Sequence, residues 1–385
     1  MKKIKFGLLP RILVAIVLGV ALGGVMPEWG IRVFLTFNGL FSQLLGFLIP
    51  LIIVGMVIPA IADIGRGAGR MLLYTVLLAY ASTIVAGMAS YFTGALTFPS
   101  LIDSAVSLDV AAEAAKLAPY FTVEIAPLMS VMTALVLAFM VGLGLAYLKG
   151  DALRNVAKDF GDLVTMTIES VIIPLLPLYI FGIFLDMTAA GEVMRVIGVF
   201  IKIIGVIFVL HIVWLILLYC ISGAVSKRNP FKMLATMLPA YFTALGTQSS
   251  AATIPVTLEQ SRKMGVSDEV SGFVIPLCAT IHMSGSMLKI VACAMALMLM
   301  QGIAFDFGMF FGFICMLAIT MVAAAGVPGG AIMAALGVLA TMLGFTAEDQ
   351  ALMISLYIAM DSFGTACNVT GDGALAAIMD RINKK

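Results

Sequence analysis

Four polar residues in an apolar segment near the C-terminal end are spaced to share one side of a helix. Asp361, Thr365, Asn368 and Asp372 are separated by four, three and four positions, and this spacing predicts a single helical face. A carboxylate can bind an ammonium group or a cation, and an amide side chain can bind a carboxylate. Because an ionisable side chain is costly to bury in such a segment, we interpret this face as a binding site. A structural ion pair is the alternative.

A second apolar run, residues 268–301, carries two basic side chains. His282 is interpreted as lining a cation site, as a proton carrier, or as a hydrogen-bonded structural histidine. A long, mostly apolar stretch follows Lys289, so its ammonium cannot easily reach a membrane surface. We therefore expect Lys289 to pair with Asp361, with Asp372 or with a bound substrate.

Two short segments combine small residues with residues that interrupt helices. In 247–255, serine hydroxyls and backbone N–H groups at the start of a helix suit an anionic carboxylate. In 323–330, the glycines and the proline cannot continue a helix and suit a gate that closes over a substrate. Helix packing by small residues and a static loop are the respective alternatives.

The composition shows the environment in which these residues must act. Of the 385 residues, 62% are hydrophobic and 11% are charged, and the mean hydropathy is +1.14. Soluble domains are about 25% charged, so the composition excludes a cytosolic enzyme, a nucleic-acid-binding protein and a disordered chain. It predicts an all-α polytopic membrane protein.

Cysteine and histidine usage argues against several kinds of site. The five cysteines form no CxxC pair and only two histidines are present, so we expect neither a disulfide framework nor a zinc site. The sequence offers no Ser/His/Asp set with usable spacing, so we do not expect an enzyme.

Apolar stretches and loop charges predict the first part of the topology. The first stretch follows basic residues and ends at Met26, and we interpret it as an uncleaved span rather than a signal peptide. Basic residues in alternate loops belong in the cytoplasm, which places both termini on the cytoplasmic side of an inner or plasma membrane. Five further spans are expected at 34–62, 70–98, 121–148, 160–188 and 196–225.

Beyond residue 230 the apolar segments are interrupted by Gly, Pro and small polar residues. Segments 231–262 and 305–345 each lie between loops of the same charge sign, so each predicts a re-entrant hairpin. With spans at 268–301 and 347–380, the expected fold has eight transmembrane helices plus two re-entrant hairpins of opposite orientation. Broken segments in matching positions of two halves are typical of a transporter's binding site. A channel with a re-entrant loop is the alternative.

This arrangement resembles the dicarboxylate/amino acid:cation symporter family, which has the glutamate-transporter fold. The resemblance covers about residues 231–380. Its motifs are the serine-rich tip ending Thr253-Ile254-Pro255-Val256-Thr257, Ala279-Thr280-Ile281-x-Met283, Gly326-Val327-Pro328-Gly329 and Asn368-Val369-Thr370-Gly371-Asp372. It implies a homotrimer that works by an elevator motion. Residues 1–230 would form the trimerisation scaffold, with the third and sixth spans joining the transport domain. Residues 231–385 would form the transport core.

Carried over residue by residue, the resemblance implies a substrate site in which Asp361 binds an amino group, Asn368 binds an α-carboxylate and Thr365 contacts the substrate side chain. The expected substrate-binding residues are Ser249, Ser250, Lys289, Val327, Gly329, Asp361, Thr365 and Asn368. One candidate sodium site comprises Cys278, His282, Asn368 and Asp372, and a second, built from backbone oxygens, comprises Thr280, Met321, Val322 and Ala324. Sodium is the implied cofactor, with proton coupling as the alternative.

The substrate prediction depends on departures from the family pattern. Members that carry acidic substrates have an Arg at the position of Gln248 or of Gly364. Because a buried unpaired carboxylate is costly, the loss of both argues against a dicarboxylic substrate. The motif around Asp361 is more similar to the serine/threonine branch, so we predict transport of a small neutral amino acid coupled to a cation. An acidic substrate held by Lys289, and an uncoupled facilitator or channel, are the alternatives.

The coupling prediction depends on a further departure. Ser284 stands where the family has a sodium-binding Asp, and His282 stands where it has an Asn. The family's partners of that Asp, in the third span, align with Val76, Ala79 and Tyr80. We therefore expect fewer sodium ions, or a proton, and hypothesise that Lys289 or His282 stands in for a coupling ion.

Overall fold

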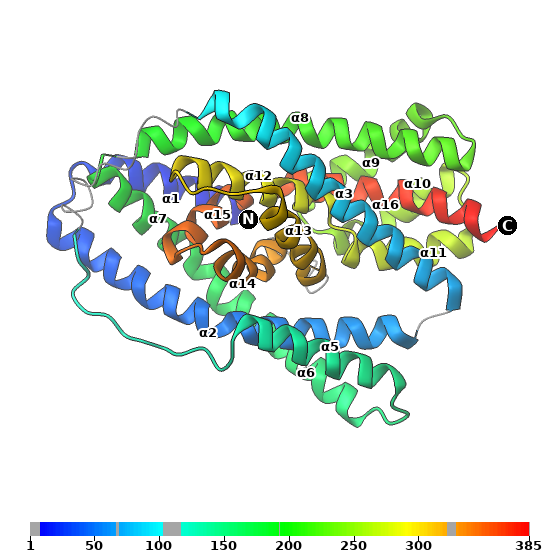
Figure 1. Ribbon diagram of the computed structural model, residues 1–385, viewed down its shortest axis with the longest axis horizontal. Coiled ribbons are helices and arrows are strands. Elements are labelled where there is room, and N and C mark those ends of the chain that lie inside the picture. Colours follow the sequence, from blue (N-terminus) through cyan, green and yellow to red (C-terminus); the bar gives the residue numbers. More distant parts are fainter. Residues whose placement is uncertain (1–7, 67–68, 103–116, 192, 322–328, 385) are drawn as a thin grey trace, which may run out of the picture.

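The computed structural model describes residues 8–66, 69–102, 117–191, 193–321 and 329–384. Within these ranges the regular secondary structure is entirely helical, as the composition predicts. Figure 1 shows an elongated bundle in which α2 (Glu28–Arg66) and α8 (Val193–Ser226) run lengthwise on opposite sides.

The N-terminal half consists of long helices packed in pairs. α1 packs on α7, α5 and α6 both pack on α2, and α6 continues through the π-helical turn η1 into α7. The bounds are α1 Leu8–Gly23, α3 Gly69–Leu101, α5 Val131–Tyr147, α6 Ala152–Thr167, η1 Ile168–Ile172 and α7 Ile173–Ala189.

The predicted span at 121–148 is wrong at its start, because residues 117–130 are not helical. The helix α5 begins at Val131, where the hydroxyl of Ser130 accepts the backbone N–H of Thr133 and caps the first turn. Pro119 and Pro127 lie in the preceding segment. A proline lacks the N–H that a helix interior requires, so an apolar composition alone overestimates the length of this helix.

The C-terminal half consists of helix pairs interrupted at short breaks. α9 ends where Gln248 adopts a left-handed conformation with φ of 54°, and Ser249 caps α10 through the N–H of Ala252. The bounds are α9 Pro230–Thr247, α10 Ser250–Lys263, α11 Asp268–Ile281, α12 Ser284–Met300, α13 Phe307–Met321, α14 Gly330–Leu343, α15 Ala347–Ala359 and α16 Asp361–Asn383.

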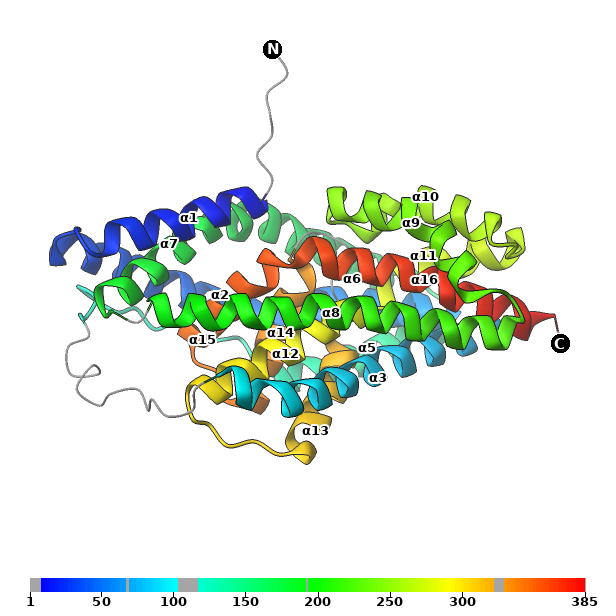
Figure 2. The same ribbon diagram turned by 90° about the horizontal axis from the view of Figure 1, so that it is seen from above.

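The interrupted helices α12 and α16 occupy the centre of the bundle. α3 packs on α12, and α8, α9 and α11 pack on α16. Figure 2 shows the α9–α10 pair and α13 on opposite sides of this centre. Residues 284–298 of α12 and 361–380 of α16 are buried almost without exception. Polar side chains in these two helices are therefore held away from the surface of the protein.

Several helices are long and apolar enough to cross a membrane. In the described residues there are five, or six if α15 and α16, which are bent by 63°, form one span. They are Glu28–Pro59, Arg70–Leu101, Ala152–Ala189, Val196–Ser226 and Asp268–Met300. Leu8–Gly23, Thr133–Tyr147, Phe307–Met321 and Gly330–Leu343 are shorter apolar helices. The architecture is that of a polytopic membrane protein, and the count of eight spans with two hairpins stays a prediction.

Candidate functional site

A buried ion pair joins α12 to the start of α16. Lys289 Nζ lies 2.9 Å from Asp361 Oδ1, and the backbone N–H of Gly329 donates to Asp361 Oδ2 at 2.8 Å. The two side chains are 0% and 4% exposed. Asp361 is the first residue of α16, where the helix dipole favours a negative charge. Of the three partners that the sequence leaves open for Lys289, the structure selects Asp361.

An aromatic ring and a glycine complete the surroundings of Lys289. Its Nζ lies 3.4 Å from the centroid of the Tyr357 ring, close enough for a cation–π interaction. The Tyr357 hydroxyl is 3.0 Å from the hydroxyl of Ser286. A Cβ atom built on Gly364 would lie 2.7 Å from both Cε and Nζ of Lys289. The lysine thus fills the space beside Gly364, where acidic-substrate members of the resembled family carry an Arg.

Asn368 stabilises the break between α11 and α12. Its Oδ1 accepts the backbone N–H of Gly285 at 2.7 Å, and its Nδ2 donates to the hydroxyl of Ser286 at 3.2 Å. It therefore acts as an N-cap supplied by another helix, satisfying a donor that α12 leaves free. The same residue of α12 also contacts α8, because Nε2 of His211 lies 2.9 Å from the carbonyl oxygen of Gly285. The sequence had not indicated His211, because its contact crosses between distant segments.

His282 connects α3 to α16. Its Nδ1 is 2.9 Å from Asp372 Oδ1 and its Nε2 is 3.0 Å from the hydroxyl of Ser82. Spacing along the sequence does not indicate this Ser/His/Asp arrangement, because elements far apart in the chain bring the three side chains together. The three residues are at most 9% exposed, so the serine is not open to a substrate in this arrangement.

Two residues of α3 form hydrogen bonds at the α11–α12 break. Ser82 contacts the His282 ring, and the hydroxyl of Thr83 accepts the backbone N–H of Met283 at 3.4 Å. Ala79 lies in the apolar cluster that contains Cys278 and Ile281 at the end of α11, and Val76 and Tyr80 pack against that cluster. The alignment of these three residues with the partners of the family's sodium-binding Asp stays a prediction.

The residues of the first candidate sodium set lie close together, but their polar atoms are held in hydrogen bonds to other protein groups. The backbone N–H of His282 donates to the carbonyl of Cys278 at 2.8 Å, while the His282 ring takes Oδ1 of Asp372. Among the described residues no three His, Cys, Asp or Glu side chains form a metal-binding group. An oxygen cage around Asp372 would require His282 to leave the carboxylate, so this arrangement does not fit sodium there.

The second candidate sodium set is described only in part. Thr280 is exposed and its hydroxyl donates to the carbonyl of Leu277, whereas Met321 is buried as the last residue of α13. Val322 and Ala324 lie outside the described residues, as does Val327 of the expected substrate site.

The serine-rich tip reaches the start of α16 through a residue other than its serines. Nε2 of Gln248 donates to the hydroxyl of Ser362 at 2.8 Å, which places the tip beside Asp361. Ser249 caps α10, and Ser250 is buried. Thr365 is buried one helical turn beyond Asp361. The structure thus brings the tip, Gly329 and Asp361 to one end of α16.

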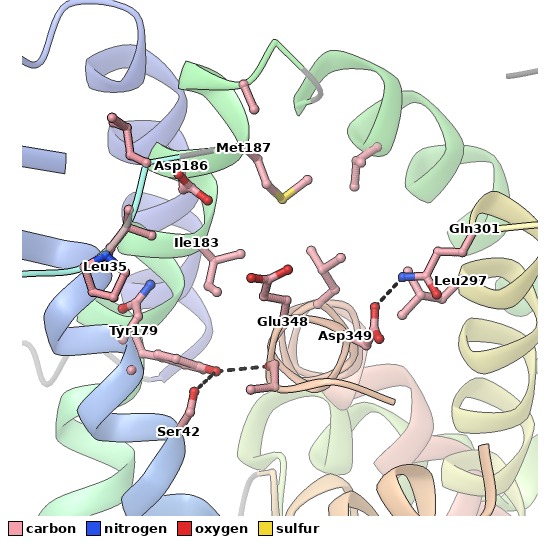
Figure 3. Close-up of a pocket in the computed structure, with 18 of the residues that line it drawn as sticks. Leu35, Ser42, Tyr179, Ile183, Asp186, Met187, Leu297, Gln301, Glu348 and Asp349 are labelled. Carbon is pink, nitrogen blue, oxygen red and sulfur yellow. Dashed lines mark hydrogen bonds between the residues drawn. The ribbon is translucent and has the colours of Figure 1, made fainter. Parts of the chain in front are cut away.

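A cavity of about 420 Å³ lies elsewhere, between α2 and α7 on one side and α12 and α15 on the other. Figure 3 shows the Tyr179 hydroxyl at its edge, bonded to the hydroxyl of Ser42 at 2.8 Å and to the carbonyl of Ala347 at 3.2 Å. Gln301 donates to Asp349 on the opposite wall. None of the expected substrate or sodium residues that the structure describes lines this cavity.

Comparisons with known proteins identify the family. Residues 8–382 match the Sodium:dicarboxylate symporter family. The chain is 34% identical over 170 residues to Excitatory amino acid transporter 2 of Homo sapiens, which is 44% of this chain and 29% of that protein. It is 30% identical over 240 residues to Excitatory amino acid transporter 1 of Bos taurus, 61% of this chain and 44% of that protein. The matches span less than half the length of these relatives.

Proposed function

The chain belongs to the sodium:dicarboxylate symporter family, and from this premise we propose that it is a secondary active transporter of a small neutral amino acid of the serine, threonine or alanine type. Members of this family are membrane symporters that couple transport to sodium, not enzymes, and the chain is a multi-pass membrane protein.

The observation that carries the proposal is the surroundings of Asp361. This carboxylate is buried, it is bonded to an ammonium group and a backbone N–H, and it lies where α12, α16, the serine-rich tip and Gly329 meet. The α-ammonium of an amino acid fits the same carboxylate. A second carboxylate on the substrate has no guanidinium partner at either of the two expected positions, because these are Gln248 and Gly364.

Packing between the two halves supports an elevator motion. α3 packs on α12 and α8 packs on α16, so these two helices are suited to move with a transport core of residues 231–385. The remaining helices of residues 1–230 would serve as the scaffold of a homotrimer with both termini in the cytoplasm. Because the His282 ring occupies Oδ1 of Asp372, the proposed transport cycle includes no sodium ion bound at Asp372.

A second candidate is an acidic amino acid. It is favoured by one observation, which is that the Lys289 ammonium lies against Gly364, the position of the missing Arg. The relatives are named excitatory amino acid transporters. In this case Lys289 would leave Asp361 and pair with the side-chain carboxylate of the substrate.

Uptake into proteoliposomes tests the two candidates. We expect radiolabelled serine, threonine and alanine to accumulate above equilibrium under an imposed inward sodium gradient, or under a proton gradient if the coupling ion is a proton. Strong aspartate uptake without uptake of any neutral amino acid would establish the second candidate. Equilibration without accumulation under every gradient would indicate an uncoupled facilitator.

A further inference from the structure

Lys289 places a cation of the protein where the proposed function places a cation of the substrate. Its Nζ is 2.9 Å from Asp361 Oδ1 and it is fully buried. In the described part of the chain, Asp361 is the only carboxylate to which Lys289 is bonded. The pair is therefore neutral as a unit, and both of its side chains are buried inside the protein.

The remaining neighbours of Lys289 are suited to hold the ammonium without neutralising it. The Tyr357 ring lies beneath it, and the absence of a side chain at Gly364 leaves room for its Cε and Nζ. Further titratable groups that interact electrostatically with it are His211 on α8, Cys293 on α12 and Cys367 on α16. A cation–π contact stabilises a desolvated ammonium, so the lysine retains a favourable position when Asp361 binds another ammonium.

The charge of the site follows from these contacts. Without substrate, Asp361 and Lys289 sum to zero. A neutral amino acid brings one ammonium and one carboxylate, so the loaded site also sums to zero. If Lys289 were absent, the carboxylate of Asp361 would have no cationic partner in the empty site, whereas in the loaded site the ammonium of the substrate would still pair with it. Moving an unpaired carboxylate through the membrane is costly, so the loss of Lys289 would hinder the return of the empty site more than the movement of the loaded one.

We propose that Lys289 is a tethered ammonium that takes the place of the substrate's ammonium on Asp361 whenever the site is empty. Its role is to let the empty transporter return across the membrane without a second solute or cation bound at this carboxylate. The chain then performs net uptake and is not restricted to exchange. This inference rests on the proposed function and assigns Lys289 a part in its transport cycle.

Net uptake and exchange are separated in two proteoliposome assays. Net uptake is measured into liposomes that contain no amino acid, and exchange is measured as entry of labelled serine into liposomes loaded with unlabelled serine. The variants are Lys289→Met, which keeps the length and removes the charge, and Lys289→Arg, which keeps the charge. Lys202→Met is the matched control, because Lys202 is exposed on α8 and donates to the carbonyl of Leu101.

We expect Lys289→Met to keep exchange and to lose net uptake by roughly a hundredfold, the factor that an unpaired charge at mid-membrane implies. Lys202→Met should retain both activities, and Lys289→Arg, which keeps the charge, should lose less net uptake relative to exchange than Lys289→Met does. Equal loss of exchange and net uptake in Lys289→Met, or full retention of net uptake, would overturn the inference. If the wild-type protein transports no amino acid in either assay, the proposed function has failed instead.

If Lys289→Met is too unstable for transport assays, thermal unfolding with and without serine tests the same inference. Serine supplies an ammonium to Asp361, so it should raise the melting temperature of Lys289→Met more than that of the wild type. A variant that unfolds regardless of serine would show that the lysine charge is structural, and the inference would be wrong.

Discussion

The long apolar helices of the two halves of the molecule differ in how much of their surface is buried inside the protein. In the most apolar stretch of Asp268–Met300, 89% of the residues are buried, against 39% in Arg70–Leu101 and 44% in Val196–Ser226. Large exposed apolar side chains are concentrated before residue 243, with few after it. The first half therefore offers its apolar surface to a bilayer, while the second half uses its interior to hold charges. Buried polar groups need partners inside the protein, and the buried ion pair and hydrogen bonds of the site are accordingly found at α12 and α16.

The largest expected effect of a single substitution is at Asp361. Asp361→Asn leaves Lys289 buried without its partner, which should destabilise the protein by about 3–5 kcal/mol, and it should abolish amino acid uptake. Asp268→Asn is the matched control, because Asp268 pairs with Arg262 at the surface and exposed pairs contribute little. Thermal unfolding in detergent measures both. Equally small effects would contradict the contrast between interior and surface.

The two buried histidines allow a charged partner to be compared with a neutral one. His282→Leu leaves the Asp372 carboxylate without its imidazole partner and should cost about 3 kcal/mol. His211→Leu leaves the neutral carbonyl oxygen of Gly285 without its hydrogen-bond donor and should lower the free energy of unfolding by about 1–3 kcal/mol. Both side chains are buried, so the difference isolates the charge of the partner. Thermal unfolding of the two variants side by side gives the order, and a larger loss for His211→Leu would reverse it.

Two substitutions of Tyr357 distinguish the contribution of its ring contact with Lys289 from that of its hydrogen bond with Ser286. Tyr357→Leu removes the ring beneath Lys289 and should cost about 2 kcal/mol beyond lost packing. Tyr357→Phe removes only the hydroxyl that contacts Ser286 and should cost about 1 kcal/mol. The free energy of unfolding in a mixed-micelle titration checks the order. If Phe were as damaging as Leu, the ring would have no role in holding the ammonium.

The smallest effect is expected on the outer face of α3. Leu77 is 56% exposed, so Leu77→Ala should change stability by less than about 0.5 kcal/mol. Leu288→Ala, at a fully buried position of α12, should cost about 2–5 kcal/mol. Thermal unfolding compares the pair. A loss of more than about 1 kcal/mol for Leu77→Ala would mean that protein rather than lipid covers this face.

Helix positions were largely predictable because each depends on local sequence. The apolar runs end within a few residues of the observed helices, and the family resemblance is confirmed by the match over residues 8–382. The span at 121–148 was wrong at its start because Pro119 and Pro127 limit the helix. Apolar composition does not reveal such an interruption, whereas the proline positions do.

Contacts between distant helices were predictable only where a charge required a partner. The depth of Lys289 limited its partners to three, and the structure pairs it with Asp361. Tyr357, His211 and Ser82 were missed, since a neutral tyrosine, a lone histidine and a serine have many possible neighbours. Their contacts depend on how α3, α8 and α15 pack against the breaks, which periodicity within one helix does not specify.

If Asp361 recognises the ammonium group of an amino acid, the protein should bind a ligand that carries an ammonium and reject one that does not. Isothermal titration of the purified protein compares L-serine with succinate, which carries two carboxylates and no ammonium, in the presence and absence of sodium. Serine should bind, succinate should not, and Asp361→Asn should abolish the serine signal. Binding of succinate without binding of serine would contradict this role of Asp361.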